Sequence, residues 1–314
     1  MIAAAMPAYS IGVDLGGTNL RAAAISRDGE MIDKISGATE LRAGREAVIA
    51  DIVDSIRTVR AKAGEKAKLA GVGIGVPGFI DIEKGLVVGS NNLPGFEGFP
   101  VRDEIEHLLG TPVLLENDAN AAAMGEKWIG AGRDVNDLIL LTLGTGIGGG
   151  IIARGRIVHG FLGMAGEFGH MTVIPNGNPC GCGNYGCLEK HASATAIAGT
   201  ARMLGLGAEV TSEEVYHLAE DGNERAKMCF RAMGEALGIA LGNLINGFNF
   251  PLYLLSGGVL AAWDLFAPPM MEQIRLRSFT FRNTTTRVEK AILGSEAGLY
   301  GAAYLPFIHR KMDA

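Results

Sequence analysis

His170 and three cysteines form the group of residues with the clearest chemistry in this sequence. The cysteines are Cys180, Cys182 and Cys187, in the run Cys-Gly-Cys-Gly-Asn-Tyr-Gly-Cys. Three thiolates and one imidazole make a complete tetrahedral ligand set for Zn²⁺, and a site whose four ligands all come from protein is structural rather than catalytic. The glycines between the cysteines allow the chain to fold around an ion. The sequence therefore predicts a structural zinc site with these four ligands.

Two other interpretations of the cysteines remain open: reduced, inert thiols on a loop, or a disulfide. Cys180 and Cys182 are only two residues apart and pair poorly, and any single disulfide in the cluster leaves an odd thiol. Clustered cysteines in a chain without a secretory signal favour a metal over a disulfide. The fourth cysteine, Cys229, lies in an apolar helical run, so we expect it in the core.

Carboxylates and amides near the cluster are candidates for binding a small polar molecule. Glu167 and Glu189 flank the cysteines, and a metal in the loop would fix the direction of both side chains. Upstream, Asn117 and Asp118 stand at a predicted strand-to-helix junction, where Asp118 could simply be the N-cap of the helix. Asn92 lies in a Ser-Asn-Asn-Leu-Pro-Gly segment that could be nothing more than a turn.

The first of three glycine turns follows Asp14, which ends a predicted buried strand. An acidic residue there is costly unless it meets a cation or hydrogen-bond donors. Gly16, Gly17 and Thr18 then offer exposed backbone N–H groups and a hydroxyl, which suit a phosphate. A tight hairpin with a solvated Asp14 explains this turn equally well.

The second turn contains Gly144, Thr145 and Gly146, and the third contains Gly257 and Gly258. No lysine follows the glycines of the second turn as a Walker motif requires, and an Ile-Ile strand stands where a dinucleotide fingerprint needs a helix. A glycine-rich hairpin without a ligand remains an alternative for it. The third turn joins a strand to a helical run and could receive an anion or an adenine. Three such turns in this order indicate a nucleotide site more strongly than any one alone.

A strand, a glycine turn and a second strand occur twice, after Asp14 and after Leu143, which predicts two similar α/β halves. Apolar periodicity gives the other elements. Strands are expected at 10–14, 20–26, 31–38, 72–76, 113–116, 138–143, 151–152, 157–158, 252–255 and near 288–293, and helices at 45–63, 101–109, 119–129, 192–204, 213–220, 224–245, 265–277 and 297–308.

Composition restricts the class of protein. The 314 residues are 48% hydrophobic and 20% charged, which is typical of a packed protein of one large domain or two ordinary ones. A net charge of -6 argues against a general nucleic-acid surface. The N-terminus lacks a basic start, and no apolar stretch reaches the roughly 18–20 residues of a membrane span. We therefore expect a cytoplasmic protein without membrane or nucleic-acid partners.

The order of the glycine turns resembles that of the hexokinase–actin superfamily, and the runs 144–170 and 180–189 resemble the signatures of the ROK family (repressors, open reading frames, kinases). The resemblance extends from Asp14 to the closing run at 296–303. It implies a two-domain, actin-like (ribonuclease H-like) α/β ATPase fold with a cleft, divided into 1–118 plus about 298–314 and 119–297, the latter with the zinc loop. Repressor members carry a helix-turn-helix before the first strand; only about eight residues precede it here, so we expect the kinase branch.

The resemblance also implies roles for individual residues. Asp118 would be the catalytic base, and Asp14 would orient Mg²⁺ through water. The sugar would be bound by Asn92, Asn117, Asp118, Glu167, His170 and Glu189. ATP would be held by Gly16, Gly17, Thr18, Gly144, Thr145 and Gly146 at its phosphates and by Gly257 and Gly258 at its nucleoside.

Within the family, the order Cys-x-Cys-Gly-x-x-Gly-Cys-Leu-Glu followed by Ala192-Ser193 resembles the bacterial glucokinase branch. That likeness implies ATP-dependent conversion of glucose to glucose 6-phosphate. Related branches phosphorylate fructose, mannose, allose, N-acetylglucosamine or N-acetylmannosamine, and some relatives accept polyphosphate. A sugar-sensing regulator without turnover is the alternative from another class. The resemblance further implies a homodimer or homotetramer.

Overall fold

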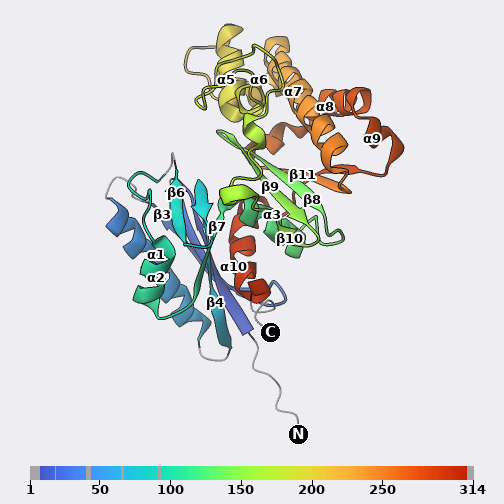
Figure 1. Ribbon diagram of the computed structural model, residues 1–314. Coiled ribbons are helices and arrows are strands. Elements are labelled where there is room, and N and C mark those ends of the chain that lie inside the picture. The colour runs from blue at the N-terminus through green and yellow to red at the C-terminus, as the bar shows by residue number, and fades with distance from the viewer. Residues whose placement is uncertain (1–7, 18, 40–43, 65–66, 91–92, 310–314) are drawn as a thin grey trace. The chain divides into compact units, whose positions relative to one another are not determined.

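The computed structural model describes residues 8–17, 19–39, 44–64, 67–90 and 93–309. The chain divides into two compact units, each of which we describe by itself (Figure 1). Unit 1 comprises Met1–Asn136, Gly150–Ala165 and Leu293–Ala314, and unit 2 comprises Asp137–Gly149 and Gly166–Ile292.

Unit 1 is built on a five-stranded mixed sheet with the order β3-β2-β1-β4-β7. Strand β1 pairs antiparallel with β2 and parallel with β4, and β4 pairs parallel with β7. This register places Asp14 opposite Arg21 on one side and opposite Gly75 on the other. The strands are β1 (Ala8–Leu15), β2 (Asn19–Ser26), β3 (Met31–Ala38), β4 (Lys68–Val76) and β7 (Val113–Asn117).

Successive residues of β1 face opposite sides of this sheet, because side chains alternate along a strand. Ile11 and Val13 belong to a buried cluster with Val48 of helix α1 (Arg45–Ala63), which α2 (Val101–Leu109) also joins. Gly12, between them, faces the backbone of α10 (Ala297–His309) on the other side. Figure 1 shows α10 lying along the sheet, opposite α1 and α2.

Glycines set the position of α3 (Asp118–Trp128) against α10. A Cβ on Gly301 would overlap the carbonyl oxygen of Ala121, and a Cβ on Gly125 would overlap that of Ala297. The two helix backbones therefore approach more closely than side chains allow, which is the use of glycine at such crossings. Because α3 begins at Asp118, this contact also holds the proposed catalytic residue in place relative to the sheet.

Unit 2 carries most of the second five-stranded sheet, with the order β10-β9-β8-β11-β12. Strand β11 pairs parallel with both β8 and β12, and β9 continues past Gly149 into unit 1. Both glycine turns predicted to join two strands do so, between β1 and β2 and between β8 and β9. The strands are β8 (Leu138–Leu143), β9 (Ile147–Ala153), β10 (Arg156–Ile157), β11 (Leu252–Ser256) and β12 (Arg287–Lys290).

The long helix α7 is the centre of the helical part of unit 2. Among the described residues it is the one helix long and apolar enough to cross a membrane by length and composition, but 67% of that window is buried in the fold. Cys229 in this helix is 2% exposed, so the prediction of a core cysteine is confirmed. The helices are α4 (Glu189–Ala192), α5 (Ala194–Met203), α6 (Ser212–Glu220), α7 (Glu224–Phe248), α8 (Trp263–Arg277) and α9 (Phe279–Asn283).

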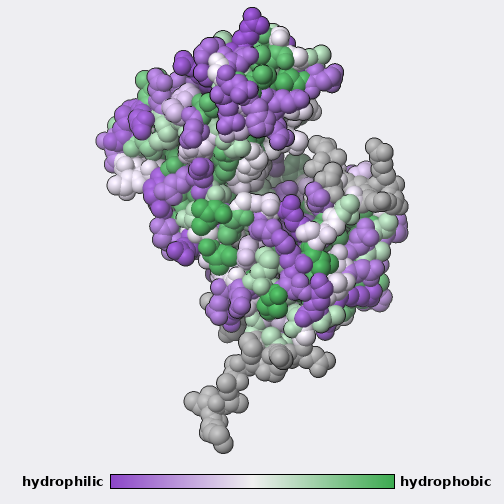
Figure 2. All heavy atoms as spheres, turned by 180° about the vertical axis from the view of Figure 1, so that it is seen from behind, coloured by the Kyte–Doolittle hydropathy of each residue, from purple (hydrophilic) through white to green (hydrophobic). Residues whose placement is uncertain are grey.

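Several local features differ from the sequence prediction; for example, helix α9 (Phe279–Asn283) was not predicted, and the strand expected near 288–293 ends at Lys290. The helix expected over 192–204 is interrupted at Ser193, whose hydroxyl accepts the N–H of Ala196 at 3.1 Å and starts α5. A small hairpin of β5 (Phe79–Asp81) and β6 (Leu86–Gly89) was not predicted, since its strands are too short to show a period. On the face shown in Figure 2, apolar residues are scattered among polar ones on the surface of each unit.

Candidate active site

The four predicted zinc ligands come together in unit 2. The ligand atoms of His170, Cys180, Cys182 and Cys187 all lie within 4.8 Å of one another. The Sγ atoms of Cys182 and Cys187 are 3.7 Å apart. Tetrahedral ligands about 2.3 Å from Zn²⁺ are themselves about 3.8 Å apart, so this spacing fits the ion. Burial raises the pKa of Cys187 to about 12, so this thiol needs a cation beside it to become the thiolate that zinc binds.

Short backbone pairings build the loop that holds this cluster. Thr172 pairs with Cys187 and Pro179 with Tyr185 in isolated antiparallel bridges. Gly186 has φ +70°, and a Cβ there would overlap the carbonyl oxygen of Ile174. Glycine at this position is therefore required both by the backbone angle and by space.

His170 has different neighbours at its two ring nitrogens. Nδ1 lies 3.6 Å from the Sγ of Cys180, and Nε2 lies 3.9 Å from a carboxylate oxygen of Glu167. Burial raises the pKa of Glu167, and Glu189 adds to the rise, while His170 opposes it. One nitrogen thus lies near a cysteine of the cluster and the other near a carboxylate outside it, an arrangement that a metal-binding histidine usually has.

Glu189 begins α4 and reaches the second glycine turn. Its Oε2 accepts the backbone N–H of Ile147 at 3.2 Å, and its Oε1 lies 3.4 Å from the ammonium of Lys190. A Cβ on Gly146 would overlap this carboxylate, so a side chain at that position would displace the Glu189 carboxylate. Within unit 2 the structure therefore links the end of the zinc loop to a residue predicted to hold phosphate.

Asn117 and Asp118 occupy successive positions at the start of α3. The N-cap is Asn117, whose Oδ1 accepts the N–H groups of Ala119 at 2.9 Å and Asn120 at 3.1 Å. Its Nδ2 donates to the carbonyl of Gly78 at 3.1 Å. Asp118 is the first helical residue, and its Oδ1 accepts the Ala119 N–H at 2.8 Å. The alternative that Asp118 is merely the N-cap is thus wrong, because Asn117 occupies that position.

Asp14 lies at the end of β1, where its Oδ2 is 3.6 Å from the guanidinium of Arg21. Burial raises the pKa of Asp14; Arg21 opposes the rise and Glu296 adds to it. The turn after it closes through the Gly16 N–H, which donates to the Asn19 carbonyl at 2.8 Å. A Cβ on Gly17 would meet nothing within 4 Å. Two further predicted site residues, Thr18 and Asn92, lie outside the described residues.

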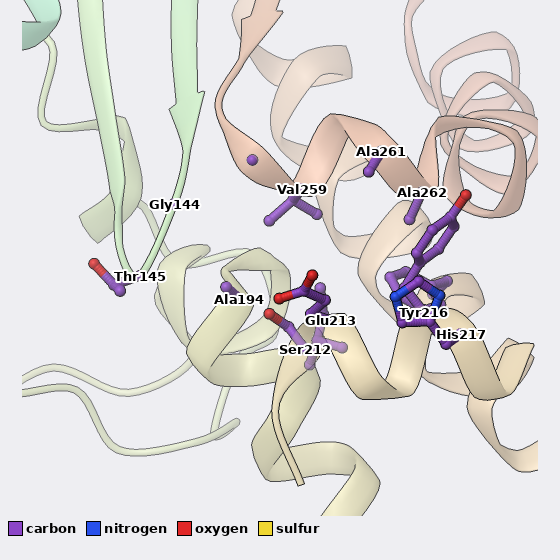
Figure 3. A pocket seen from close by; sticks show the side chains of 13 residues that line it. Gly144, Thr145, Ala194, Ser212, Glu213, Tyr216, His217, Val259, Ala261 and Ala262 are labelled. Carbon is purple, nitrogen blue, oxygen red and sulfur yellow. The ribbon is translucent and has the colours of Figure 1, made fainter. Parts of the chain in front are cut away.

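The second and third glycine turns line one cavity of about 460 Å³ within unit 2 (Figure 3). Gly144 and Thr145 lie at one end of it in this view, Tyr216 and His217 at the other, with Glu213 between them. The remaining lining residues are Ala194, Ile197, Ser212, Phe230, Gly258, Val259, Ala261 and Ala262.

The two turns meet because β8 and β11 are parallel neighbours, with Thr142 opposite Ser256. Gly257 has φ +102°, and a Cβ there would overlap the backbone of Leu143. A hydrogen bond also connects the second turn to the start of α5: the backbone N–H of Ala194 donates to the carbonyl oxygen of Gly144 at 2.8 Å. Backbone groups at one end and apolar side chains with an aromatic at the other suit a phosphorylated nucleoside.

Sequence reasoning missed the α6 side of this cavity. Glu213, Tyr216 and His217 line it, although none of them stands in a glycine turn. A local signal does mark the start of α6: Thr211 and Glu214 form a capping box. That pattern locates the helix but not the cavity, since only the tertiary fold brings α6 beside the turns.

Comparison with known proteins agrees with these features. The ROK family model matches residues 10–307. The chain is 36% identical over 312 residues to a glucokinase of Halalkalibacterium halodurans, covering 95% of this chain and 94% of the relative. It is 38% identical over 306 residues to a glucokinase of Thermotoga maritima, covering 93% of this chain and 95% of the relative.

The chain belongs to the ROK family. A ROK hexokinase from Thermus thermophilus superposes with a TM-score of 0.88 at 33% identity, over 97% of this chain and 99% of that one. A ROK glucokinase from Streptomyces griseus, in complex with glucose and AMPPNP, superposes with a TM-score of 0.76 at 34% identity, over 95% and 98%. The predicted actin-like α/β fold is confirmed. A xylose repressor of Caldicellulosiruptor bescii is 32% identical over 304 residues, covering 93% of this ROK protein and 76% of the repressor.

Proposed function

We propose that this ROK protein is an ATP-dependent hexose kinase, and that glucose is its substrate. The observation that carries the proposal is the cavity of unit 2, in which Gly144 and Thr145 of one glycine turn and Gly258 of another line the same space. Glucokinases at 36% and 38% identity, and the bound glucose and AMPPNP of the Streptomyces griseus enzyme, support both substrates.

In this proposal Asp118 is the general base. Its carboxylate would accept the proton of a sugar hydroxyl while that oxygen forms a bond to the γ-phosphorus of ATP and the bond to the β-phosphate oxygen breaks. The position of Asp118 is well defined, because Asn117 caps α3 and Gly301 holds the helix against α10. A carboxylate is a weak base in water, so its contribution comes from placement rather than from basicity.

The nucleotide would lie along the cavity with its phosphates at the Gly144–Gly146 turn and its base beside Tyr216. Gly257 and Gly258 would border the nucleoside. Asp14 is proposed to orient Mg²⁺ through water, and Gly16, Gly17 and Thr18 to contact phosphate. When bound, Mg²⁺ supplies neutralisation of the charge on the transferring phosphoryl group.

The residues proposed to hold the sugar are Asn92, Asn117, Glu167, His170 and Glu189. We propose Zn²⁺ as the ion of the Cys180–Cys187 loop, because three thiols and an imidazole nitrogen lie at tetrahedral spacing. Its role would be structural: it would fix the direction of His170. Asn117 has its oxygen engaged by the helix, so in this role it would contribute its second amide hydrogen.

The test is formation of the sugar phosphate from a panel of hexoses, each with ATP and with polyphosphate as the donor. We expect glucose to have the highest kcat/KM and ATP to be the preferred donor. A higher kcat/KM for fructose, mannose, allose or an N-acetylhexosamine would retain the kinase and replace the sugar. No sugar phosphate from any sugar with either donor, together with glucose binding in calorimetry, would favour a sugar-sensing regulator.

A further inference from the structure

A second cavity of about 460 Å³ lies in unit 1. Four basic side chains line it: Arg154 and Arg156 at the β9–β10 hairpin, His159 just after it, and His309 at the end of α10. None of these residues belongs to the sites described above. The carboxylate of Glu116, directly before Asn117, is part of the same lining.

Glu116 is 3% exposed and its carboxylate is fully engaged. Oε1 accepts the backbone N–H of Asn117 at 2.9 Å and the side-chain amide of Asn120 at 3.0 Å. Oε2 lies 2.7 Å from Nε2 of His159. The hydrogen bond to Glu116 raises the pKa of His159, against an opposing effect of burial. When His159 is protonated, its imidazolium neutralises the carboxylate of Glu116, and the pair together adds no net charge to the cavity.

The protonated His159 has a second donor. An imidazolium donates from both nitrogens, and only Nε2 is used on Glu116. The side chain is 37% exposed and is part of the cavity lining. Among the residues that line the cavity, basic side chains outnumber the single carboxylate, and arginine stays charged at any physiological pH.

The rest of the lining is apolar. Ile157 of β10, Ile82 after β5, and Leu305 and Ile308 of α10 form it. Cations beside an apolar wall suit a ligand with a compact anion on a small hydrophobic or neutral body. Guanidinium groups bind phosphate oxygens by paired, charge-assisted hydrogen bonds, so a dianionic phosphate monoester matches the charge better than a carboxylate.

We propose that this cavity is a binding site for a small organic phosphate monoester. The phosphate contacts Arg156, Arg154 and the Nδ1–H of His159, and the body packs on Ile157 and Leu305. All of these residues belong to unit 1, whereas the proposed nucleotide cavity belongs to unit 2. The proposal therefore adds a ligand to the proposed function and does not depend on it.

The effect of a bound phosphate on turnover rests on the proposed function. A phosphate at Nδ1 of His159 adds a second anionic partner to the imidazole ring whose Nε2 lies against Glu116, and Glu116 also accepts the N–H of Asn117 at the start of α3. Asp118 is the next residue. Binding should therefore change kcat more than the KM of either substrate.

Calorimetry of the full chain with phenyl phosphate tests the site, with the nucleotide cavity saturated by AMPPNP and Mg²⁺. We expect binding to the native chain, and at least a ten-fold weaker Kd in Arg156→Glu. Arg231→Glu, an equal charge change at an exposed residue of α7, should bind as the native chain does. Benzoate and phenol should bind more weakly than phenyl phosphate. No binding to the native chain, equal binding in Arg156→Glu, or benzoate as the tighter ligand would overturn the proposal.

His159→Gln provides a second variant that keeps a neutral donor and should weaken binding several-fold. In kinetics, phenyl phosphate should change the kcat of the native chain and of Arg231→Glu but not that of Arg156→Glu. An unchanged kcat despite measured binding would remove the coupling to Asp118. Binding by a chain that releases no ADP with any sugar would contradict the proposed function and leave the site standing.

Discussion

The backbone N–H of Ile147 donates to the carboxylate of Glu189 at 3.2 Å. Glu189 stands two residues after Cys187, and Ile147 directly follows Gly146 of the second glycine turn. The end of the metal loop and the proposed phosphate loop are therefore joined within unit 2. Loss of the ion would release Cys187 and, through Glu189, the glycine turn. This link makes the proposed zinc relevant to nucleotide binding as well as to the sugar.

Replacing Cys182 by Ser should lower the zinc content from about one ion per chain to a small fraction of that. Zinc sites depend on thiolate ligands, and a serine hydroxyl is a poor substitute. We expect the KM for both ATP and sugar to rise, since Glu189 and His170 lose their fixed positions. Elemental analysis and steady-state kinetics measure the two effects. Cys229→Ser, the cysteine outside the cluster, should retain its zinc; full zinc in Cys182→Ser would contradict the ligand assignment.

The zinc cluster was predictable because three of its ligands lie within eight residues and the fourth ten residues earlier, so local chain geometry brings them together. The glycine turns were predictable for a similar reason: each ends a strongly apolar strand. The pair of Glu116 and His159 gave no signal, because 43 residues separate them and only the tertiary fold makes them meet. For Asn117 and Asp118 the sequence left the cap undecided, since both residue types are good N-caps.

Asp118→Asn should reduce kcat by about 10²–10⁴-fold, the usual contribution of a positioned general base. Asparagine retains an oxygen for the Ala119 N–H, so the helix start and sugar binding should be preserved. ADP release gives kcat, and calorimetry with glucose gives the sugar Kd. Asp51→Asn, at an exposed position of α1, is the matched control and should be unaffected. A variant at Asp118 with near-native kcat would remove this residue as the base.

Asp14→Asn should raise the melting temperature while lowering activity. Burial raises the pKa of Asp14, so the fold disfavours its ionised form, and near pH 7 that ionisation costs stability. Asparagine has the same shape and no charge, so it removes the cost of burying an ionised carboxylate. Part of this gain is lost because Arg21 no longer has a charged partner. Turnover should fall, and the Mg²⁺ concentration for half-maximal rate should rise, if Asp14 orients the ion. Lower thermal stability in this variant would mean that the pair with Arg21 outweighs the desolvation.

The stabilisation from His159 and Glu116 should depend on pH. The pKa of His159 is raised in the fold, so its contribution is complete below the unfolded value of about 6.5 and is lost as pH rises through the folded value. The melting-temperature difference between the native chain and Glu116→Gln should be larger at pH 6 than at pH 9. Arg154, Arg156 and His309 line the same cavity. A difference that grows toward pH 9 would reverse the assigned sign.

Gly301→Ala should be strongly destabilising, because its Cβ would overlap the carbonyl oxygen of Ala121 in α3. Backbone cannot yield as a flexible side chain does, so we expect a loss of about 1–3 kcal/mol in the free energy of unfolding, or more. Gly199→Ala in α5 is the matched control: its Cβ would meet nothing within 4 Å. That change should stabilise the chain by about 0.5–1 kcal/mol, since glycine is a poor helix former. Denaturant unfolding measures the stability of both variants.

Because α3 begins at Asp118, Gly301→Ala should also lower kcat at temperatures where the chain is still folded, whereas Gly199→Ala should not. Equal stabilities for the two variants would mean that α3 and α10 can separate freely, and the position of Asp118 would then need another support.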